Sequence, residues 1–177
     1  MNEPNNSSII CVDASLVLRL ALGGPYQDEV DTHWQQWLDR GTQFVAPPLF
    51  GFEVTSTLWQ QVYHQRMTLT QGQQLFEQIF NQGITLEYPP DLHRHAWQIA
   101  QQFNLHAAYD AHYVALAQQF KCEFWTMDVR CYQALHKKLP WVKTVADPAS
   151  VNKKQSTSET SSSALIRSPI SEFLTSS

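Results

Sequence analysis

Three aspartates of this chain stand where a helix is expected to begin, and two of them directly follow a run of apolar residues. They are Asp13 after the run 9–12, Asp128 after the run 123–127, and Asp110 before the helical pattern 111–120. Each has apolar or aromatic residues three, four and seven positions further on, which places it at the head of a helix face turned to the core. The three carboxyl groups are therefore expected next to the core, at the starts of their helices.

A fourth acid, Glu53, lies one turn into a helix that is expected to begin at Pro47 and Pro48. Its immediate neighbours are apolar residues or glycine, and the small polar Ser56 and Thr57 occupy the next turn on its side. An acid on a helix is usually exposed when nothing else is known of it. Here the neighbours favour a half-buried carboxylate, which requires a cation.

A single aspartate at a helix start is most often an N-cap, which accepts hydrogen bonds from the free amides of the first turn. Four carboxylates brought together need another explanation, because like charges repel and burial penalises each charged group. A divalent cation offsets both costs, and acids without a neighbouring lysine suit Mg²⁺ or Mn²⁺. Such sites serve phosphate chemistry, in which one cation activates water and another stabilises the leaving oxygen.

Short β-like runs alternate with longer helical patterns along residues 1–150, and this alternation predicts the elements that must position the acids. Strands are expected at 9–12, 44–46, 84–88, 124–126 and 142–145. Helices are expected from residue 16 to Gly23, at 28–39 and 47–66, from the N-cap Thr70 to Gly83, at 91–103 and 108–119, and from Asp128 to residue 138. The pattern predicts the doubly wound α/β class, with a mostly parallel sheet covered by helices on both faces. Ligands bind such sheets just beyond the carboxyl ends of the strands, where Asp13 and Asp128 are expected.

The same patterns predict which side chains lie near the acids. The apolar side of the helix 47–66 is expected to carry Phe52, Trp59, Val62 and Tyr63. Arg130 lies two residues beyond Asp128 and is a candidate for substrate contact at the mouth of the site.

Four segments resemble the acidic motifs of the PIN domain family. Their order and spacing are most similar to those of VapC-type toxin ribonucleases. The segments are Ile9-Ile10-Cys11-Val12-Asp13-Ala14-Ser15, Glu53 after Ala46-Pro47-Pro48, Tyr109-Asp110-Ala111-His112-Tyr113-Val114-Ala115-Leu116-Ala117, and Phe124-Trp125-Thr126-Met127-Asp128. The resemblance covers about residues 8–146. It implies a three-layer α/β/α fold with about five strands, and magnesium-dependent endonucleolytic cleavage of RNA.

The resemblance also implies roles for individual residues and partners. Asp13, Glu53, Asp110 and Asp128 would form the catalytic and metal-binding site, and Ser15 and Thr126 match positions where the family often has a hydroxyl lining it. A small antitoxin and a second copy of the nuclease are the implied partners. The sequence departs from the pattern at Tyr132, where many members of the family carry another acid or Asn. Whether a second metal binds is therefore left open.

Composition limits the remaining classes of protein. The chain has 177 residues and a formal net charge of −4, so a large basic surface for nucleic acid is not expected. Residues 1–150 carry a charge of −5, and two divalent cations bound at the acids would bring it to −1. The longest apolar stretch, 16–22, is too short to span a membrane, and three scattered Cys indicate reduced thiols in a cytoplasmic protein. Residues 151–177 hold nine Ser and three Thr, which predicts a disordered tail after a single domain at 1–150.

Other sites fit the sequence less well. His93, His95, His106 and His112 could be imagined as zinc ligands, but no second Cys-x-x-Cys half accompanies Cys122 and Cys131. Neither a phosphate-binding Gly-rich loop nor a serine nucleophile elbow is present in the sequence. Two alternatives to a toxin stay open: a non-catalytic module that binds RNA or protein, and an RNA-processing nuclease without an antitoxin.

Overall fold

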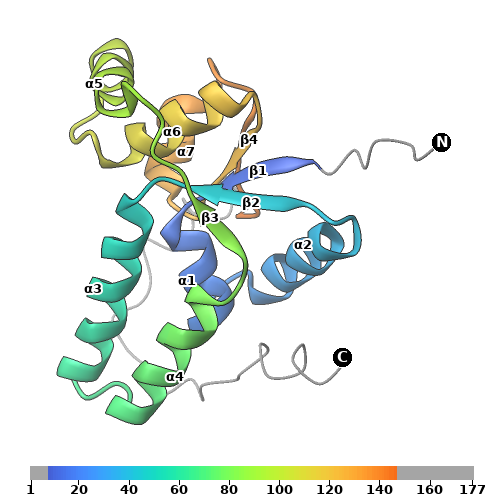
Figure 1. Ribbon diagram of the computed structural model, residues 1–177, viewed down its shortest axis with the longest axis vertical. Coiled ribbons are helices and arrows are strands. Elements are labelled where there is room, and N and C mark those ends of the chain that lie inside the picture. Colours follow the sequence, from blue (N-terminus) through green and yellow to red (C-terminus); the bar gives the residue numbers. More distant parts are fainter. Residues whose placement is uncertain (1–7, 147–177) are drawn as a thin grey trace, which may run out of the picture.

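The computed structural model describes residues 8–146, which alternate between strands and helices throughout (Figure 1). In chain order the elements are β1 (Ile9–Val12), α1 (Ala14–Leu22), α2 (Gln27–Asp39), β2 (Gln43–Ala46), α3 (Leu49–Tyr63), α4 (Leu69–Phe80), β3 (Ile84–Leu86), α5 (Leu92–Phe103), α6 (Tyr109–Phe120), β4 (Glu123–Trp125), α7 (Val129–Leu135) and β5 (Val142–Lys143). The expected order of strands and helices is confirmed, and most boundaries differ from the sequence estimates by a few residues. The tail predicted for 151–177 lies outside the described residues.

The described strands form one parallel sheet in the order β3-β2-β1-β4-β5. From β1 the chain steps outward to β2 and β3, then returns to the other side of β1 for β4 and β5. Because crossovers between parallel strands are right-handed, this reversal sends the later connections to the opposite face. Figure 1 shows α1 to α4 on one side of the sheet and α5 and α6 on the other. The predicted α/β class and three-layer α/β/α arrangement are confirmed.

The reversal of strand order falls between β1 and β4, which pair with Val12 opposite Trp125. The amide of Asp13 continues this pairing by donating a hydrogen bond to the carbonyl of Trp125 over 3.1 Å. Thr126 extends β4 in the same way, since its amide donates to the carbonyl of Lys143 over 3.0 Å. Open α/β sheets bind ligands where the strand order reverses. A ligand site is therefore expected among the residues that follow β1 and β4.

The packing of α3 differs from the expectation. The residues of α3 that are buried are Phe50, Val54 and Leu58, whereas Phe52, Trp59 and Tyr63 are 74 %, 58 % and 69 % exposed. The sequence reading assigned the second group to the apolar side because α3 carries large apolar residues on more than one face. Only one of those faces meets α1 and the sheet. The other remains as a surface of aromatic side chains.

The N-cap of α4 is Thr68 rather than Thr70. The hydroxyl of Thr68 accepts from the amide of Gln71 over 3.2 Å, and the Gln71 side chain accepts from the Thr68 amide over 2.8 Å. This reciprocal pair is a capping box, which satisfies two amides at the helix start. Thr70 is exposed within the first turn of the helix.

In the part of the chain that the structure describes, no helix is long and apolar enough to cross a membrane.

The capping box predicts a specific stability difference between two neighbouring threonines. Thr68→Ala should lower the free energy of unfolding by about 1 kcal/mol, because the Gln71 amide loses its acceptor. Thr70→Ala, the matched control, should leave it unchanged or raise it slightly, since alanine has the higher helix propensity. Urea unfolding followed by circular dichroism measures both. Equal losses in the two variants would contradict the assigned cap.

Candidate active site

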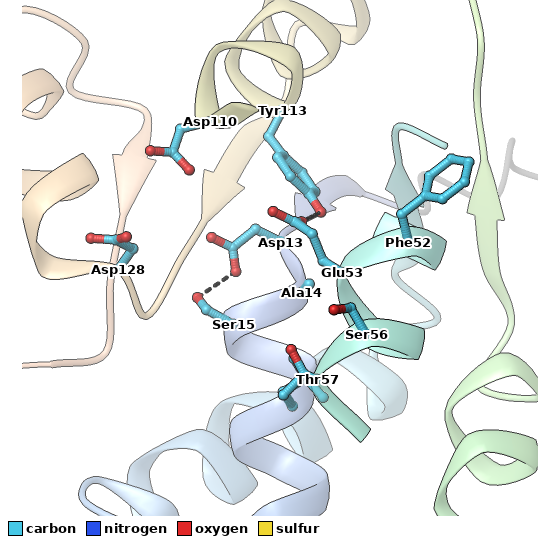
Figure 2. A pocket seen from close by; sticks show the side chains of 11 residues that line it. Asp13, Ala14, Ser15, Phe52, Glu53, Ser56, Thr57, Asp110, Tyr113 and Asp128 are labelled. Atoms are coloured by element: carbon cyan, nitrogen blue, oxygen red, sulfur yellow. Dashed lines mark hydrogen bonds between the residues drawn. The ribbon is translucent and has the colours of Figure 1, made fainter. Parts of the chain in front are cut away.

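Asp13, Glu53, Asp110 and Asp128 all line one pocket at the carboxyl ends of β1 and β4 (Figure 2). The pocket has a volume of about 390 Å³, and its other lining residues are Ala14, Ser15, Leu18, Phe52, Ser56, Thr57 and Tyr113. The acids come from four chain segments: the N-cap of α1 directly after β1, the second turn of α3, the first turn of α6, and the N-cap of α7 shortly after β4. The structure therefore brings together the four acids that the sequence singled out.

Asp13 is the most firmly held of the four. It is the N-cap of α1 and is only 5 % exposed. Its Oδ1 accepts from the amide of Leu16 over 3.1 Å and from the hydroxyl of Ser15 over 2.5 Å, and its Oδ2 accepts from the hydroxyl of Thr126. Burial raises the pKa of this carboxyl to about 6, and the hydrogen bonds limit the rise. Asp13 is therefore both a structural cap and a pocket carboxylate.

The two hydroxyl residues join β1 to β4 beneath the acids. Thr126 is fully buried, and its hydroxyl accepts from the amide of Asp128 over 2.9 Å while donating to Asp13. Ser15 lines the pocket, and its hydroxyl accepts from the amide of Met127 over 2.9 Å. The family resemblance implies that Thr126 lines the site, but Thr126 is fully buried, is not among the pocket-lining residues, and positions Asp13 and Asp128 instead.

Asp128 and Asp110 occupy different positions at the beginnings of their helices. Asp128 is the N-cap of α7, and its Oδ1 accepts from the amides of Arg130 and Cys131 over 2.8 and 3.1 Å. Asp110 was expected to open its helix, but α6 begins at Tyr109 and Asp110 lies in the first turn without a capping hydrogen bond. The pKa of Asp110 rises to about 6, mainly through burial and then through the charges of Asp128 and Asp13. These two carboxyls therefore keep oxygens that the helices do not use.

Glu53 is held by a residue that the sequence reading placed in the core. The hydroxyl of Tyr113 donates to Oε2 of Glu53, and its ring stacks on Phe124 at 5.8 Å between centroids. Tyr113 is only 1 % exposed, and burial raises the pKa of its phenol far enough to keep it a proton donor. Burial raises the pKa of Glu53, and the charge of Asp110 adds to the rise. The spacing from Asp110 predicts that Tyr113 is buried. It does not predict that the Tyr113 hydroxyl reaches α3.

Two other sequence candidates lie outside the pocket. The side chain of Arg130 is exposed and is not among the lining residues. Tyr132, where the PIN resemblance implies an acid or Asn, stacks on His136 with ring centroids 4.4 Å apart. Neither side chain contributes an oxygen ligand to the pocket.

The pocket carboxylates fit a hydrated divalent cation. Within residues 8–146 the ion pairs join Arg94 to Asp91 and Lys143 to Glu123, so no lysine or arginine neutralises the pocket. Among these residues, no group of three or more acids, histidines or cysteines is placed so that it could hold a metal ion. Mg²⁺ does not require three protein ligands, because it keeps several waters and binds proteins through one or two carboxylates. The donor set and its uncompensated charge suit that mode of binding.

The three-layer fold also occurs in solved structures of other proteins. PAE2754 from Pyrobaculum aerophilum aligns with a TM-score of 0.58 and 19 % identity, covering 87 % of this chain and 100 % of the other. A chain of a toxin-antitoxin complex from Klebsiella pneumoniae aligns with a TM-score of 0.52 and 18 % identity, covering 80 % of this chain and 99 % of the other. No family model and no curated protein matches the sequence. At these identities the likeness establishes the fold.

The raised pKa of Asp110 predicts how stability depends on pH and on metal. Its carboxyl titrates near 3.8 when unfolded and near 6 when folded, so the metal-free protein loses stability as the pH rises from about 4 to about 6. Asp110→Asn removes this penalty and should raise the melting temperature by a few degrees at about pH 7.5, with little change near pH 4. Millimolar Mg²⁺ should raise the melting temperature of the wild type more than that of the variant.

Differential scanning fluorimetry at the two pH values, with chelator or Mg²⁺, measures these shifts. Asp39→Asn is the matched control, because Asp39 is an exposed carboxylate at the end of α2. It should behave as the wild type does. A wild type that is as stable as Asp110→Asn at about pH 7.5 without metal would contradict the electrostatic reading of the pocket.

Proposed function

We propose that this protein is a magnesium-dependent endoribonuclease of the PIN type and the toxin of a toxin–antitoxin pair. The observation that carries the proposal is the meeting of Asp13, Glu53, Asp110 and Asp128 in one pocket without a neutralising lysine or arginine among residues 8–146. The sequence motifs of the PIN family supply these same acids. The fold shared with a chain of a toxin-antitoxin complex supports the toxin role.

The proposed reaction is hydrolysis of an RNA phosphodiester bond. A bound Mg²⁺ or Mn²⁺ supplies a Lewis acid that stabilises charge on the phosphate and lowers the pKa of water. Asp13, Asp110 and Asp128 would hold the cation, partly through its waters, and would so fix where the phosphate binds. Glu53, oriented by Tyr113, accepts a proton from the attacking water as its oxygen bonds to phosphorus and the bond to the leaving oxygen breaks. Its raised pKa suits a general base that works near neutral pH.

Cleavage of RNA tests the enzyme directly. Purified protein incubated with a panel of single-stranded and structured RNAs should cut them with Mg²⁺ or Mn²⁺ and not with chelator. Asp110→Asn should lower the rate by at least about a hundredfold, because a metal-binding carboxylate is lost. Asp39→Asn should retain the wild-type rate. If the wild type and Asp110→Asn were equally inert across the panel, the non-catalytic binding module would be favoured instead.

A partner protein is supported by an exposed apolar groove between α3 and α4. The groove has a volume of about 170 Å³, and its walls include Leu58, Trp59, Val62, Leu69 and Phe76. Trp59 and Leu69 are 58 % and 56 % exposed. The two helices approach closely at Gly72, where an added Cβ would lie 2.5 Å from Val62. An apolar surface of this kind is typical of a protein interface, and we assign it to the antitoxin.

Expression in a bacterial host tests the toxin role. The wild type should arrest growth, and Asp110→Asn should not. The product of a short reading frame next to the gene should restore growth to the wild type but not to Trp59→Glu, because a charge in the apolar groove weakens docking. Trp97→Glu, at an exposed tryptophan of α5 outside the groove, is the matched control and should still be neutralised. A nuclease that cuts RNA without arresting growth would instead be an RNA-processing enzyme.

A further inference from the structure

A second pocket lies beside the acidic one and is built largely from rings. It has a volume of about 440 Å³, and the side chains that define it as the aromatic pocket are Phe52, Tyr88, His93, Tyr109 and His112. Leu92 and the start of α3 complete its apolar walls. Three of the rings are largely exposed: Phe52 by 74 %, Tyr88 by 62 % and Tyr109 by 64 %.

The acidic and aromatic pockets share the same two helices. On α3, Glu53 lines the acidic pocket, while Phe52 next to it lines both pockets. On α6, Asp110 and Tyr113 line the acidic pocket, whereas their neighbours Tyr109 and His112 line the aromatic one. Figure 2 shows the ring of Phe52 turned away from the acids while Glu53 points toward them. A chain-like substrate that places one unit at the acids therefore meets the aromatic pocket with the next unit.

The histidines give the aromatic pocket a polar end. Nδ1 of His112 lies 2.6 Å from the carbonyl of Ala108, so it carries the proton and donates. With both rings neutral, its Nε2 accepts from Nδ1 of His93, which lies 2.9 Å away. The same ring of His93 makes an edge contact with Tyr88 at 5.3 Å. This chain of hydrogen bonds fixes both rings and leaves Nε2 of His93 as its outer end.

We propose that the aromatic pocket binds an unpaired nucleobase of the RNA, next to the phosphate held at the acidic pocket. This inference rests on the proposed nuclease function and names the part of the substrate that the protein recognises. Exposed flat rings stack on nucleobases, and RNA is read mainly through unpaired bases that stack on aromatic side chains. The outer nitrogen of His93 and the tyrosine hydroxyls provide hydrogen-bonding groups for a base edge. Continuity with the acidic pocket favours RNA over a partner protein or a second copy of the chain.

Equilibrium binding of two labelled oligomers tests the proposal. One is a single-stranded RNA of about a dozen nucleotides, and the other is a ribose-phosphate backbone of equal length without bases. Binding is measured by fluorescence anisotropy with Ca²⁺ in place of Mg²⁺. The wild type should prefer the RNA, and Tyr88→Ala should weaken RNA binding by about tenfold while leaving binding of the abasic oligomer unchanged. Tyr88→Phe should retain RNA binding to within about threefold, because the ring remains. Trp97→Ala, an exposed tryptophan on α5 outside the pocket, is the matched control.

The outcomes separate this inference from the nuclease function. RNA cleavage with Mg²⁺, together with equal binding by the wild type and Tyr88→Ala, would overturn the nucleobase site and leave the nuclease. Base-dependent binding that is lost in Tyr88→Ala, with no cleavage, would support the nucleobase site and contradict the nuclease. A change of oligomeric state in Tyr88→Ala by light scattering, with RNA binding unchanged, would assign the surface to a contact between copies and overturn the site.

Discussion

One electrostatic constraint governs the structure: four carboxylates lie in one pocket, and no lysine or arginine of residues 8–146 forms an ion pair with them. Burial raises the pKa of Asp13 and Asp110 to about 6, and that rise measures a cost carried by the folded, metal-free chain. The fold offsets part of the cost at Asp13 by aiming the Ser15 and Thr126 hydroxyls and the Leu16 amide at its oxygens. A cation bound as proposed would offset the remainder. Stability and metal binding would then be coupled through the same side chains.

This constraint explains why each site residue lies where it does along its helix. On α6, Asp110 and Tyr113 line the acidic pocket, because positions three apart share a helix face. Tyr109 and His112, each one position earlier, line the aromatic pocket. A shift of α6 by one residue could place Tyr109 and His112 where Asp110 and Tyr113 lie, and the acidic pocket would lose a carboxylate. Packing between the helix and the sheet, including the stacking of Tyr113 on Phe124, therefore fixes the chemistry of both pockets.

The sequence was sufficient for the fold class and for the four acids, since both depend on local patterns. Strand-like runs that end in an acid define the edge of a parallel sheet, and Asp13 and Asp128 show that signal. Contacts between distant segments were not predictable. That Tyr113 reaches Glu53 depends on how α6 packs against α3, and the periodicity of α6 shows only that the residue is buried. The exposed face of α3 was misassigned because hydrophobicity does not reveal which of two apolar faces meets the core, as Trp59 illustrates.

The negative charge of the chain also limits the ways in which it could bind RNA under the proposed function. Proteins that bind nucleic acid through a basic surface gain affinity by releasing counterions from many phosphates. This chain has a formal net charge of −4, and four of its 16 acids line the pocket where the proposed reaction requires a phosphate to enter. For the proposed binding of RNA, affinity must come from contacts that do not require a positive surface: a cation between carboxylates and phosphate, and rings that stack on a base. In this proposal the acidic and aromatic pockets would provide these two contacts side by side, so each would compensate for what the other lacks.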